Sequence, residues 1–346
     1  MVNFIRKIAF PFSFLYKWIT SLRNYLFDIN VLKSTEFDIP TIVVGNLSVG
    51  GTGKTPQIEY LIRLLSKKYK VAVLSRGYKR KSKGFVIADS NSNVEIIGDE
   101  PYQYFQKFKN VSVCVDADRV HGVQQLLNRK PKTEVVLLDD AFQHRKIKGG
   151  LNILLTSFDN LYCDDIILPT GNLRESAIGA KRAQIIVVTK CPEKLSENQL
   201  FKIAKKLNPS LYQTIFFTTI SYDTVIKGAD KITMDDLNGS EILVVTGIAN
   251  PTPLLDHLKN NNIKYNHLKF KDHHQFSNQD ITTIKQEFNK ISSNKKIVLT
   301  TEKDYVRIFG KLPNVYYISI KTKFINHKKD FDNLINAYVE SSTGNR

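Results

Sequence analysis

An eight-residue segment directly after an apolar run constrains this chain more than any other feature. Residues 48–55 read Ser-Val-Gly-Gly-Thr-Gly-Lys-Thr and follow the apolar run at 41–44. Closely spaced glycines let backbone N–H groups approach phosphate oxygens, and the lysine and threonine that end the segment can reach the terminal phosphates and a Mg²⁺ ion. A strand, a phosphate-binding loop and a helix are therefore expected, although Ser48 stands where the strict pattern has glycine. The expected nucleotide-binding residues are Ser48, Val49, Gly50, Gly51, Thr52, Gly53, Lys54 and Thr55.

A second, acidic segment would complete such a site. Four apolar residues at 135–138 precede Asp139 and Asp140, as expected for a central parallel strand that is buried on both faces. Ligands of open α/β sheets bind at the carboxyl ends of the strands, where both aspartates would lie. A polar turn after a strand is the alternative that this segment alone leaves open. The predicted ligands of Mg²⁺ are Thr55, Asp139 and Asp140, with an aspartate acting directly or through water.

Composition limits the function classes. The 346 residues suffice for two domains or one large one, and the hydrophobic share of 42% is enough for a core. The net charge of +17 favours anionic partners, such as nucleic acid, an acidic membrane surface or a phosphorylated substrate. Cys114, Cys163 and Cys191 lack the spacing of a zinc site, and their scatter indicates a reducing compartment.

Residues 1–35 combine aromatic, aliphatic and basic side chains. Charges interrupt the segment too often for a membrane-spanning helix, and no cleavage site of a secretory signal follows. An amphipathic helix lying in a membrane interface fits this composition, and a helix packed on the protein's own core fits it equally. The apolar stripe at helical spacing consists of Leu15, Trp18, Ile19, Leu22 and Leu26, and the interleaved basic residues are Arg6, Lys7, Lys17 and Arg23.

Beyond this segment, apolar strands alternate with amphipathic helices. Such alternation predicts a parallel, doubly wound α/β sheet, as in P-loop nucleotide-binding domains, over residues 36–215. The pattern restarts after about residue 215, which predicts a smaller α/β domain at 241–346 and a linker or hinge at 216–240. The predicted strands are 41–46, 71–74, 111–115, 135–138, 151–155 and 185–189 in the first domain, and 242–247, 264–270 and 296–301 in the second.

Four polar segments are further candidates for chemistry. Asp99 lies in the Gly-Asp-Glu-Pro sequence at 98–101, where it could accept the proton of an attacking hydroxyl or cap a helix. Arg119 and Arg174 lie in polar turns, where each could hold a phosphate or lie at the surface without a role. The Asp-His-His sequence at 272–274 could transfer a proton or be structural.

Together these segments resemble the tetraacyldisaccharide 4′-kinases of lipid A biosynthesis. The resemblance runs from the aromatic N-terminus to about residue 307, and the joint order and spacing of the segments carry it. Ala141 and Asn172 depart from the family pattern at positions that shape the backbone, where glycine and proline are usual. Residues 301–304 belong to the pattern, but no chemistry is assigned to them. The matching segments are 45–46, 48–55, 75–78, 98–101, 118–119, 139–144, 173–175, 272–273 and 301–304.

The resemblance implies a reaction and a location. The γ-phosphoryl group of ATP, with Mg²⁺, would pass to the 4′-hydroxyl of a tetraacylated glucosamine disaccharide 1-phosphate, and the product would be lipid IVA. The protein would be peripheral on the cytoplasmic face of the bacterial inner membrane, with the glycolipid and the membrane surface as partners. We expect a monomer and no nucleic-acid partner.

The resemblance also implies a set of catalytic residues. Asp99 would take or relay the proton together with His273, and these two residues lie in different predicted domains. The domains must then close over the nucleotide, so a hinge is expected at 216–240. The expected catalytic residues are Asp99, His273, Lys54, Arg119, Arg174 and Glu175.

Two other classes of function share part of this pattern. A P-loop switch ATPase of the partitioning or targeting type shares the Gly-Gly-x-Gly-Lys-Thr sequence, but typically carries an extra lysine near the place of Val49. A nucleic-acid-binding ATPase would explain the charge of +17, yet the sequence contains no recognised nucleic-acid module.

Overall fold

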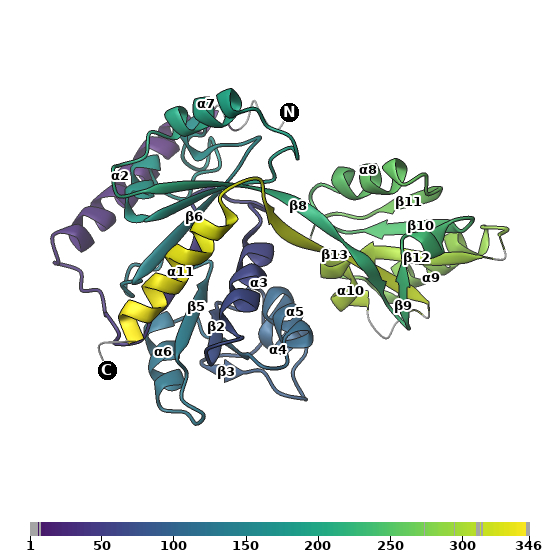
Figure 1. Ribbon diagram of the computed structural model, residues 1–346, viewed down its shortest axis with the longest axis horizontal. Coiled ribbons are helices and arrows are strands. Elements are labelled where there is room, and N and C mark those ends of the chain that lie inside the picture. The colour runs from purple at the N-terminus through teal and green to yellow at the C-terminus, as the bar shows by residue number, and fades with distance from the viewer. Residues whose placement is uncertain are drawn as a thin grey trace.

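The structure, a computed structural model, describes residues 6, 8–272, 274–293, 295–308, 312 and 314–343. It contains two α/β units that are connected by a pair of long strands (Figure 1). The strands of the first unit are β1 (Thr41–Asn46), β2 (Val71–Ser75), β3 (Val86–Ile87), β4 (Ser112–Val115), β5 (Val135–Asp139), β6 (Leu151–Ser157), β7 (Ile185–Thr189) and the first part of β8 (Thr214–Lys227). Its helices are α2 (Phe10–Asp28), α3 (Lys54–Leu65), α4 (Val94–Ile97), α5 (Asp99–Lys107), α6 (Arg119–Leu127), α7 (Glu197–Leu207) and the 3₁₀ turns η1 (Tyr162–Asp164) and η2 (Ala177–Arg182).

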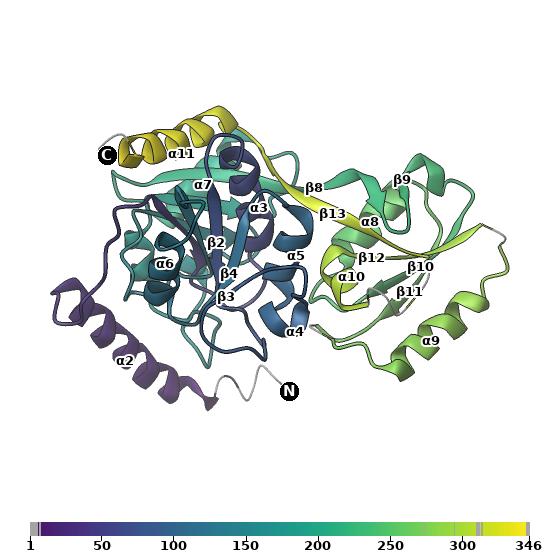
Figure 2. The ribbon, with the colours of Figure 1, turned by 90° about the horizontal axis from the view of Figure 1, so that it is seen from below.

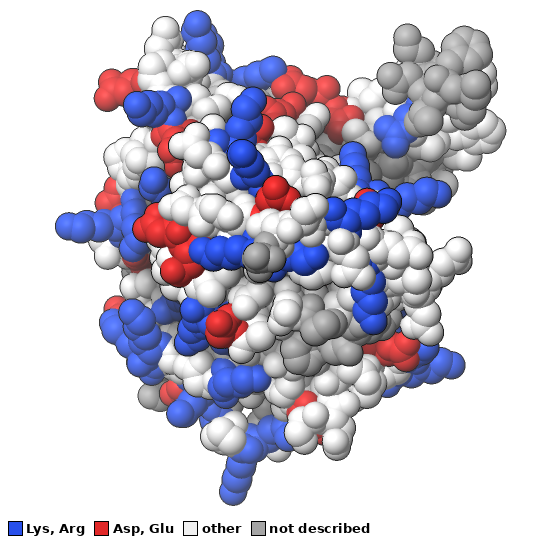
Figure 3. Space-filling model, turned by 90° about the vertical axis from the view of Figure 1, so that its right-hand side faces the viewer, with Lys and Arg blue, Asp and Glu red and all other residues white. Residues whose placement is uncertain are grey.

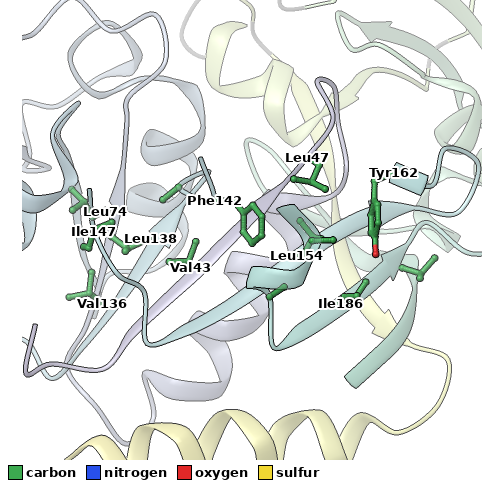
Figure 4. Close-up of a cluster of buried hydrophobic side chains, with 14 of the residues drawn as sticks. Val43, Leu47, Leu74, Val136, Leu138, Phe142, Ile147, Leu154, Tyr162 and Ile186 are labelled. Carbon is green, nitrogen blue, oxygen red and sulfur yellow. The ribbon is translucent and has the colours of Figure 1, made fainter. Parts of the chain in front are cut away.

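The first sheet has the order β3-β4-β2-β5-β1-β6-β7-β8, and its pairs are parallel except for β3 with β4. Its central strands are buried on both faces, as their continuous apolar runs predict. Val43 and Leu138 point into the cluster shown in Figure 4, whereas Ile42 and Leu137 pack with the side chains of α3 on the other face. The predicted parallel α/β sheet is therefore confirmed, and it places the end of β1 beside the end of β5.

The second unit is smaller and also has helices on both faces of a mostly parallel sheet (Figure 2). Its order is β11-β10-β12-β13-β8-β9, in which only the contacts of β8 with β13 and β9 are antiparallel among the described strands. Its remaining elements are β9 (Lys231–Thr233), η3 (Asp235–Leu237), β10 (Glu241–Thr246), α8 (Thr252–Asn260), β11 (Tyr265–Lys269), α9 (Asn278–Asn289), β12 (Lys296–Thr301), α10 (Glu302–Ile308) and β13 (Val315–Phe324). The last described element is α11 (Lys328–Thr343).

The segment expected as a linker at 216–240 is instead regular structure. Strand β8 pairs with β7 through its first residues and with β13 and β9 through the rest, so it belongs to both sheets. Strand β13 runs antiparallel to it, from Lys227 opposite Tyr317 to Thr218 opposite Phe324. The two units are thus joined by a two-stranded ribbon, because hydrogen bonding continues from one sheet into the other.

The C-terminal boundary also differs from the expected one at 346. Helix α11 follows the second unit in sequence but packs on the first sheet, beside α3 (Figure 1). Phe331, Ile335 and Val339 are fully buried there, at a spacing of four residues that puts them on one helical face. The first unit therefore includes both α2 and α11, and the second ends with β13.

Helix α2 keeps most of its apolar side chains in solvent. Only Ser13 and Phe27 of the helix are buried, so packing on the protein's own core does not account for the apolar stripe. None of the described helices has the length and apolar character needed to cross a membrane. The exposed large side chains of the helix are Phe10, Phe12, Phe14, Leu15, Tyr16, Trp18, Ile19, Leu22 and Tyr25.

Positively charged side chains are scattered over the end of the molecule that the second unit forms. Seen from this end, lysine and arginine side chains alternate with acidic and uncharged groups and form no continuous basic stripe (Figure 3). The charge of +17 is therefore not gathered into one groove on this face.

Candidate active site

The expected phosphate-binding loop is the turn between β1 and α3. Gly50 and Gly53 have φ angles of +107° and +82°, a conformation that side chains other than glycine adopt with strain. A Cβ atom added at Gly50 would meet nothing within 4 Å, so the loop is open on that side. The hydroxyl of Thr52 is buried and has no hydrogen-bond partner among the described residues. An open loop with an unsatisfied inward donor fits the phosphate groups that the sequence predicts.

Residues outside the predicted set hold this loop. The Thr189 hydroxyl donates to the Thr52 carbonyl at 2.8 Å, and the Lys190 ammonium contacts the Gly51 carbonyl. On the opposite side, the Val49 N–H donates to the carbonyl of Asn172 at 2.8 Å. Thr189 ends a predicted strand and Lys190 follows it, and this position at the carboxyl end was the signal that could have identified them.

The acidic segment lies next to the loop, as predicted. Asp139 ends β5 and is buried, and it accepts a long hydrogen bond of 3.4 Å from the Tyr104 hydroxyl. Burial, and then the charges of Asp140 and Glu100, raise the pKa of Asp139 to about 7. The Tyr104 hydroxyl also bonds the Thr55 side chain, so the two predicted metal-binding groups share one neighbour.

Asp140 lies at the centre of a cluster of charges. Its Oδ1 is 3.0 Å from Nη1 of Arg174 and 3.4 Å from Nζ of Lys54. Burial alone would raise the pKa of Asp140, but Lys54 and Arg174 outweigh it and hold that pKa below its ordinary value. Lys54 also donates to Oδ1 of Asn46 at 3.1 Å. The structure thus brings together three of the predicted site residues at the mouth of the loop.

Hard oxygen groups are present for a magnesium ion, but they do not form a complete cage. No group of three or more His, Cys, Asp or Glu residues that could hold a metal occurs in the described part of the chain. Magnesium keeps several waters and commonly takes only one or two carboxylates, with substrate phosphates as further ligands. Thr55 and Asp139, which both contact the Tyr104 hydroxyl, fit an ion of this kind bound together with a nucleotide.

Glu175 positions other groups of the site. It is 3% exposed, and its Oε1 accepts hydrogen bonds from Arg182 at 2.7 Å and Gln143 at 3.0 Å. Its Oε2 accepts from Asn24 of α2 at 2.6 Å. Gln143 in turn donates to the Asn46 carbonyl at 2.9 Å. Glu175 therefore connects α2 with the end of β1 and is a structural support for the site.

Arg119 begins α6 and is 2% exposed. Its Nη1 donates to the carbonyls of Asp116 at 3.0 Å and Ala117 at 3.1 Å, but its Nε has no hydrogen-bond partner among the described residues. Burial lowers the pKa of Arg119 to about 10, and Asp139 opposes this change. A buried cation with an unused donor beside the acidic segment can accept an anionic ligand.

Asp99 lies at the start of α5, and a residue of the second unit holds it. Arg307 of α10 donates through Nε to Oδ2 of Asp99 at 2.9 Å and also contacts it through Nη2. Sequence reasoning missed Arg307, because nothing local marks it. The other half of the predicted pair, His273, lies outside the described residues. Its neighbour His274 bonds Asp280 at 3.0 Å and stacks on Phe270.

Helix α2 covers one side of the site with its polar stripe. The Tyr16 hydroxyl donates to the Arg174 carbonyl at 3.0 Å, and Arg23 donates to the Gln143 carbonyl at 3.0 Å. A surface cavity of about 520 Å³ lies beside these contacts. It combines basic, acidic and apolar side chains, and its lining residues are Arg23, Phe27, Leu32, Ala117, Asp118, His144, Arg145 and Lys146.

Comparisons with known proteins agree with this geometry. Residues 5–340 match the family model of tetraacyldisaccharide-1-P 4′-kinase. The tetraacyldisaccharide 4′-kinase of Flavobacterium johnsoniae is 56% identical to this chain over 99% of both proteins, and that of Flavobacterium psychrophilum is 52% identical over 99% of this chain and 100% of the relative. The crystal structure of the "apo" form of LpxK from Aquifex aeolicus in complex with ATP superposes with a TM-score of 0.78 at 33% identity and covers 97% of this chain and 99% of that one. The chain therefore belongs to the tetraacyldisaccharide-1-P 4′-kinase family.

Proposed function

We propose that this protein transfers the γ-phosphoryl group of ATP to the 4′-hydroxyl of a tetraacylated glucosamine disaccharide 1-phosphate, which makes lipid IVA in lipid A biosynthesis. The observation that carries the proposal is the convergence of Lys54, Asp140 and Arg174 at the open mouth of the phosphate loop. The acceptor is inferred from the activity that names the family to which the chain belongs.

The nucleotide is ATP with Mg²⁺. The backbone N–H groups of residues 50–54 and the Thr52 hydroxyl face the phosphates, and Lys54 reaches the terminal ones. Thr55 and Asp139, with Asp140 beside them, would hold a magnesium ion, which would supply positive charge to neutralise the nucleotide phosphates. The buried guanidinium of Arg119 and that of Arg174 add positive charge around the transferring group.

Asp99 accepts the proton of the acceptor hydroxyl. An alcohol loses its proton with difficulty in water, so a positioned carboxylate at the reacting oxygen contributes typically 10²–10⁴-fold, as an order of magnitude. His273 acts with Asp99 in this step. Glu175 acts indirectly, because its hydrogen bonds fix Gln143 and Asn24.

The acceptor lies between α2 and the loop that follows β5. The exposed aromatic side chains of α2 support contact with a membrane interface, and the proposed location is peripheral, on the cytoplasmic face of the inner membrane. The same helix contacts the site through Tyr16 and Arg23, so one element holds both the acyl chains and the sugar. The cavity next to Arg23 carries the cations and the apolar surface that suit a sugar phosphate with acyl chains.

The two units close over the nucleotide by bending the ribbon of β8 and β13. Helix α10 already contacts α5, the helix that begins with Asp99. Small-angle scattering should show a smaller radius of gyration with a non-hydrolysable ATP analogue and Mg²⁺ than without them. Equal scattering curves would contradict closure.

The decisive experiment is transfer of label from γ-³²P ATP to purified acylated disaccharide 1-phosphate in detergent with Mg²⁺, with mass spectrometry of the product. A monophosphate gain on the acceptor supports the proposal. Folded protein that hydrolyses ATP without acceptor, dimerises with nucleotide and leaves the lipid unchanged would instead indicate a switch ATPase. Sedimentation with and without nucleotide tests the expected monomer in the same samples.

A further inference from the structure

We infer that Arg307 is a positioning residue for Asp99. Because Arg307 lies on the second unit, it orients the Asp99 carboxylate as proton acceptor only when the two units are in contact. The inference rests on the proposed function, because Asp99 is the proton acceptor there. Arg307 lies on α10 of the second unit, and Asp99 lies on α5 of the first, 208 residues earlier in the chain.

The guanidinium of Arg307 lies between two carboxylates. Its side chain is 1% exposed, and Nη1 is 3.3 Å from Oδ1 of Asp304. Nε donates to Oδ2 of Asp99 at 2.9 Å, and Nη2 contacts the same oxygen. A planar guanidinium presents donors in fixed directions, so fixing one of its edges also fixes the direction of the other.

The second unit holds the Asp304 side of this arrangement rigidly. Asp304 is fully buried, and its Oδ2 accepts hydrogen bonds from the Gly247 N–H and the Thr301 hydroxyl, both at 2.9 Å. Gly247 directly follows β10, and Thr301 ends β12, so the carboxylate is tied to two strand ends. The orientation of Arg307 is therefore set by the second sheet.

Both contacts from Arg307 to Asp99 use the same oxygen. They thereby set the rotation of the Asp99 carboxylate and keep a positive charge beside it. Asp99 is the first residue of α5, and a Cβ added at the preceding Gly98 would be 3.1 Å from the Tyr78 carbonyl, so the backbone here packs closely on the first unit. Arg307 adds the orientation of the side chain, and it does so from the other unit.

The neighbouring ion pairs distinguish a positioning role from simple docking. Lys303 of α10 is 3.3 Å from Glu100, and Lys107 of α5 is 2.8 Å from Glu302. These two ion pairs connect α5 with α10, and neither of them involves Asp99. Loss of Lys303 should therefore weaken the contact between the units and leave the orientation of Asp99 intact, which makes Lys303→Ala the matched control for Arg307→Ala.

The test compares steady-state kinetics of full-length protein with ATP and the acylated disaccharide 1-phosphate. We expect Arg307→Ala to lower kcat about 10- to 100-fold, as loss of alignment at a reacting group does, with KM for ATP changed by less than about threefold. Arg307→Lys should have a kcat between those of Arg307→Ala and the parent, since lysine keeps the positive charge but lacks the planar set of guanidinium donors. Lys303→Ala should stay within about threefold of the parent.

A double-mutant cycle separates positioning from general stability. In an Asp99→Ala background, Arg307→Ala should reduce the residual kcat by less than about twofold, because both residues act through one group. Since Arg307→Ala leaves Asp304 buried without its cation, Arg307→Gln with Asp304→Asn provides a charge-neutral variant, and circular dichroism checks that it folds. This variant should show the same fall in kcat.

The outcomes that overturn the inference are distinct. A kcat equal to that of the parent in folded Arg307→Gln/Asp304→Asn would refute positioning by Arg307. So would a fall in kcat on adding Arg307→Ala to Asp99→Ala that is as large as the fall in the parent. Either result leaves the proposed function intact. Parent protein that is folded and binds ATP but phosphorylates no acceptor would refute the proposed function and this inference with it.

Discussion

Lys107→Ala should strongly destabilise the protein, because Lys107 is the cation of a buried charge cluster. Its Nζ is 2.8 Å from Glu59 of α3 and 2.8 Å from Glu302 of α10, and the three side chains are 11%, 1% and 10% exposed. After the substitution, Glu59 still has its ion pair with Arg63 at 2.7 Å, whereas Glu302 loses its ion pair with the lysine and remains close to the carboxylate of Glu59. Breaking a buried pair in this way costs about 3–5 kcal/mol, against about 0–1 kcal/mol for an exposed one.

The loss should be visible in thermal unfolding and should depend on pH. At roughly 2–4 °C per kcal/mol, the Tm of Lys107→Ala should fall by roughly 6–20 °C. Burial, and then the charge of Glu59, raise the pKa of Glu302 in the folded protein above its ordinary value. The folded state therefore binds this proton more readily than the unfolded chain, and protonation as the pH falls from 8 to 5 should restore part of the stability of the variant.

Two comparisons make the result decisive. Lys109→Ala, two residues away and exposed, should change the free energy of unfolding by less than about 0.5 kcal/mol. Glu302→Gln in the Lys107→Ala background should restore much of the loss, since it removes the uncompensated carboxylate. A Lys107→Ala protein as stable as Lys109→Ala at pH 8, or a larger loss at pH 5 than at pH 8, would refute the reasoning.

Four further results follow from the structure. Asp99→Ala should lower kcat by roughly 100-fold or more with little change in ATP affinity, and near-normal turnover would remove Asp99 from its role. Lys54→Ala should lower kcat/KM for ATP by at least about 100-fold, measured in the same label-transfer assay; a parental value would mean that the loop does not hold the phosphates. Ile335→Ala, at a buried site of α11, should cost about 2–5 kcal/mol in urea unfolding, whereas Leu334→Ala, at an exposed one, should cost less than about 0.5 kcal/mol; equal costs would mean that α11 does not pack as described. Trp18→Ser, at a side chain that is 61% exposed, should weaken flotation with anionic vesicles by about tenfold without lowering Tm, and unchanged flotation would argue against membrane contact through this face.

Local patterns in the chain were enough to identify the nucleotide side of the site. The glycines at 50 and 53, the lysine that begins α3 and the apolar strand before Asp139 each act through their own backbone segment, so their spacing carries the information. Parallel strands β1 and β5 then bring the two segments together, as the rule on carboxyl strand ends requires.

The boundary between the two units could not be predicted from local sequence patterns. Strand β8 has an ordinary apolar and polar pattern, and only its pairing with β13, about a hundred residues later, shows that it belongs to both sheets. Helix α11 likewise carries a regular apolar stripe, but a stripe does not say which sheet it will cover.

By itself, the sequence determined that this protein has a phosphate loop, an acidic strand end and an amphipathic first helix, because each depends on residues that are neighbours in the chain. Only the tertiary structure decided that Arg307 holds Asp99, that Glu175 supports the site through Gln143 and Asn24, and that α11 belongs to the first unit. These features consist of contacts between distant segments, and their energy comes from burial and charge pairing that exist only once the chain has folded.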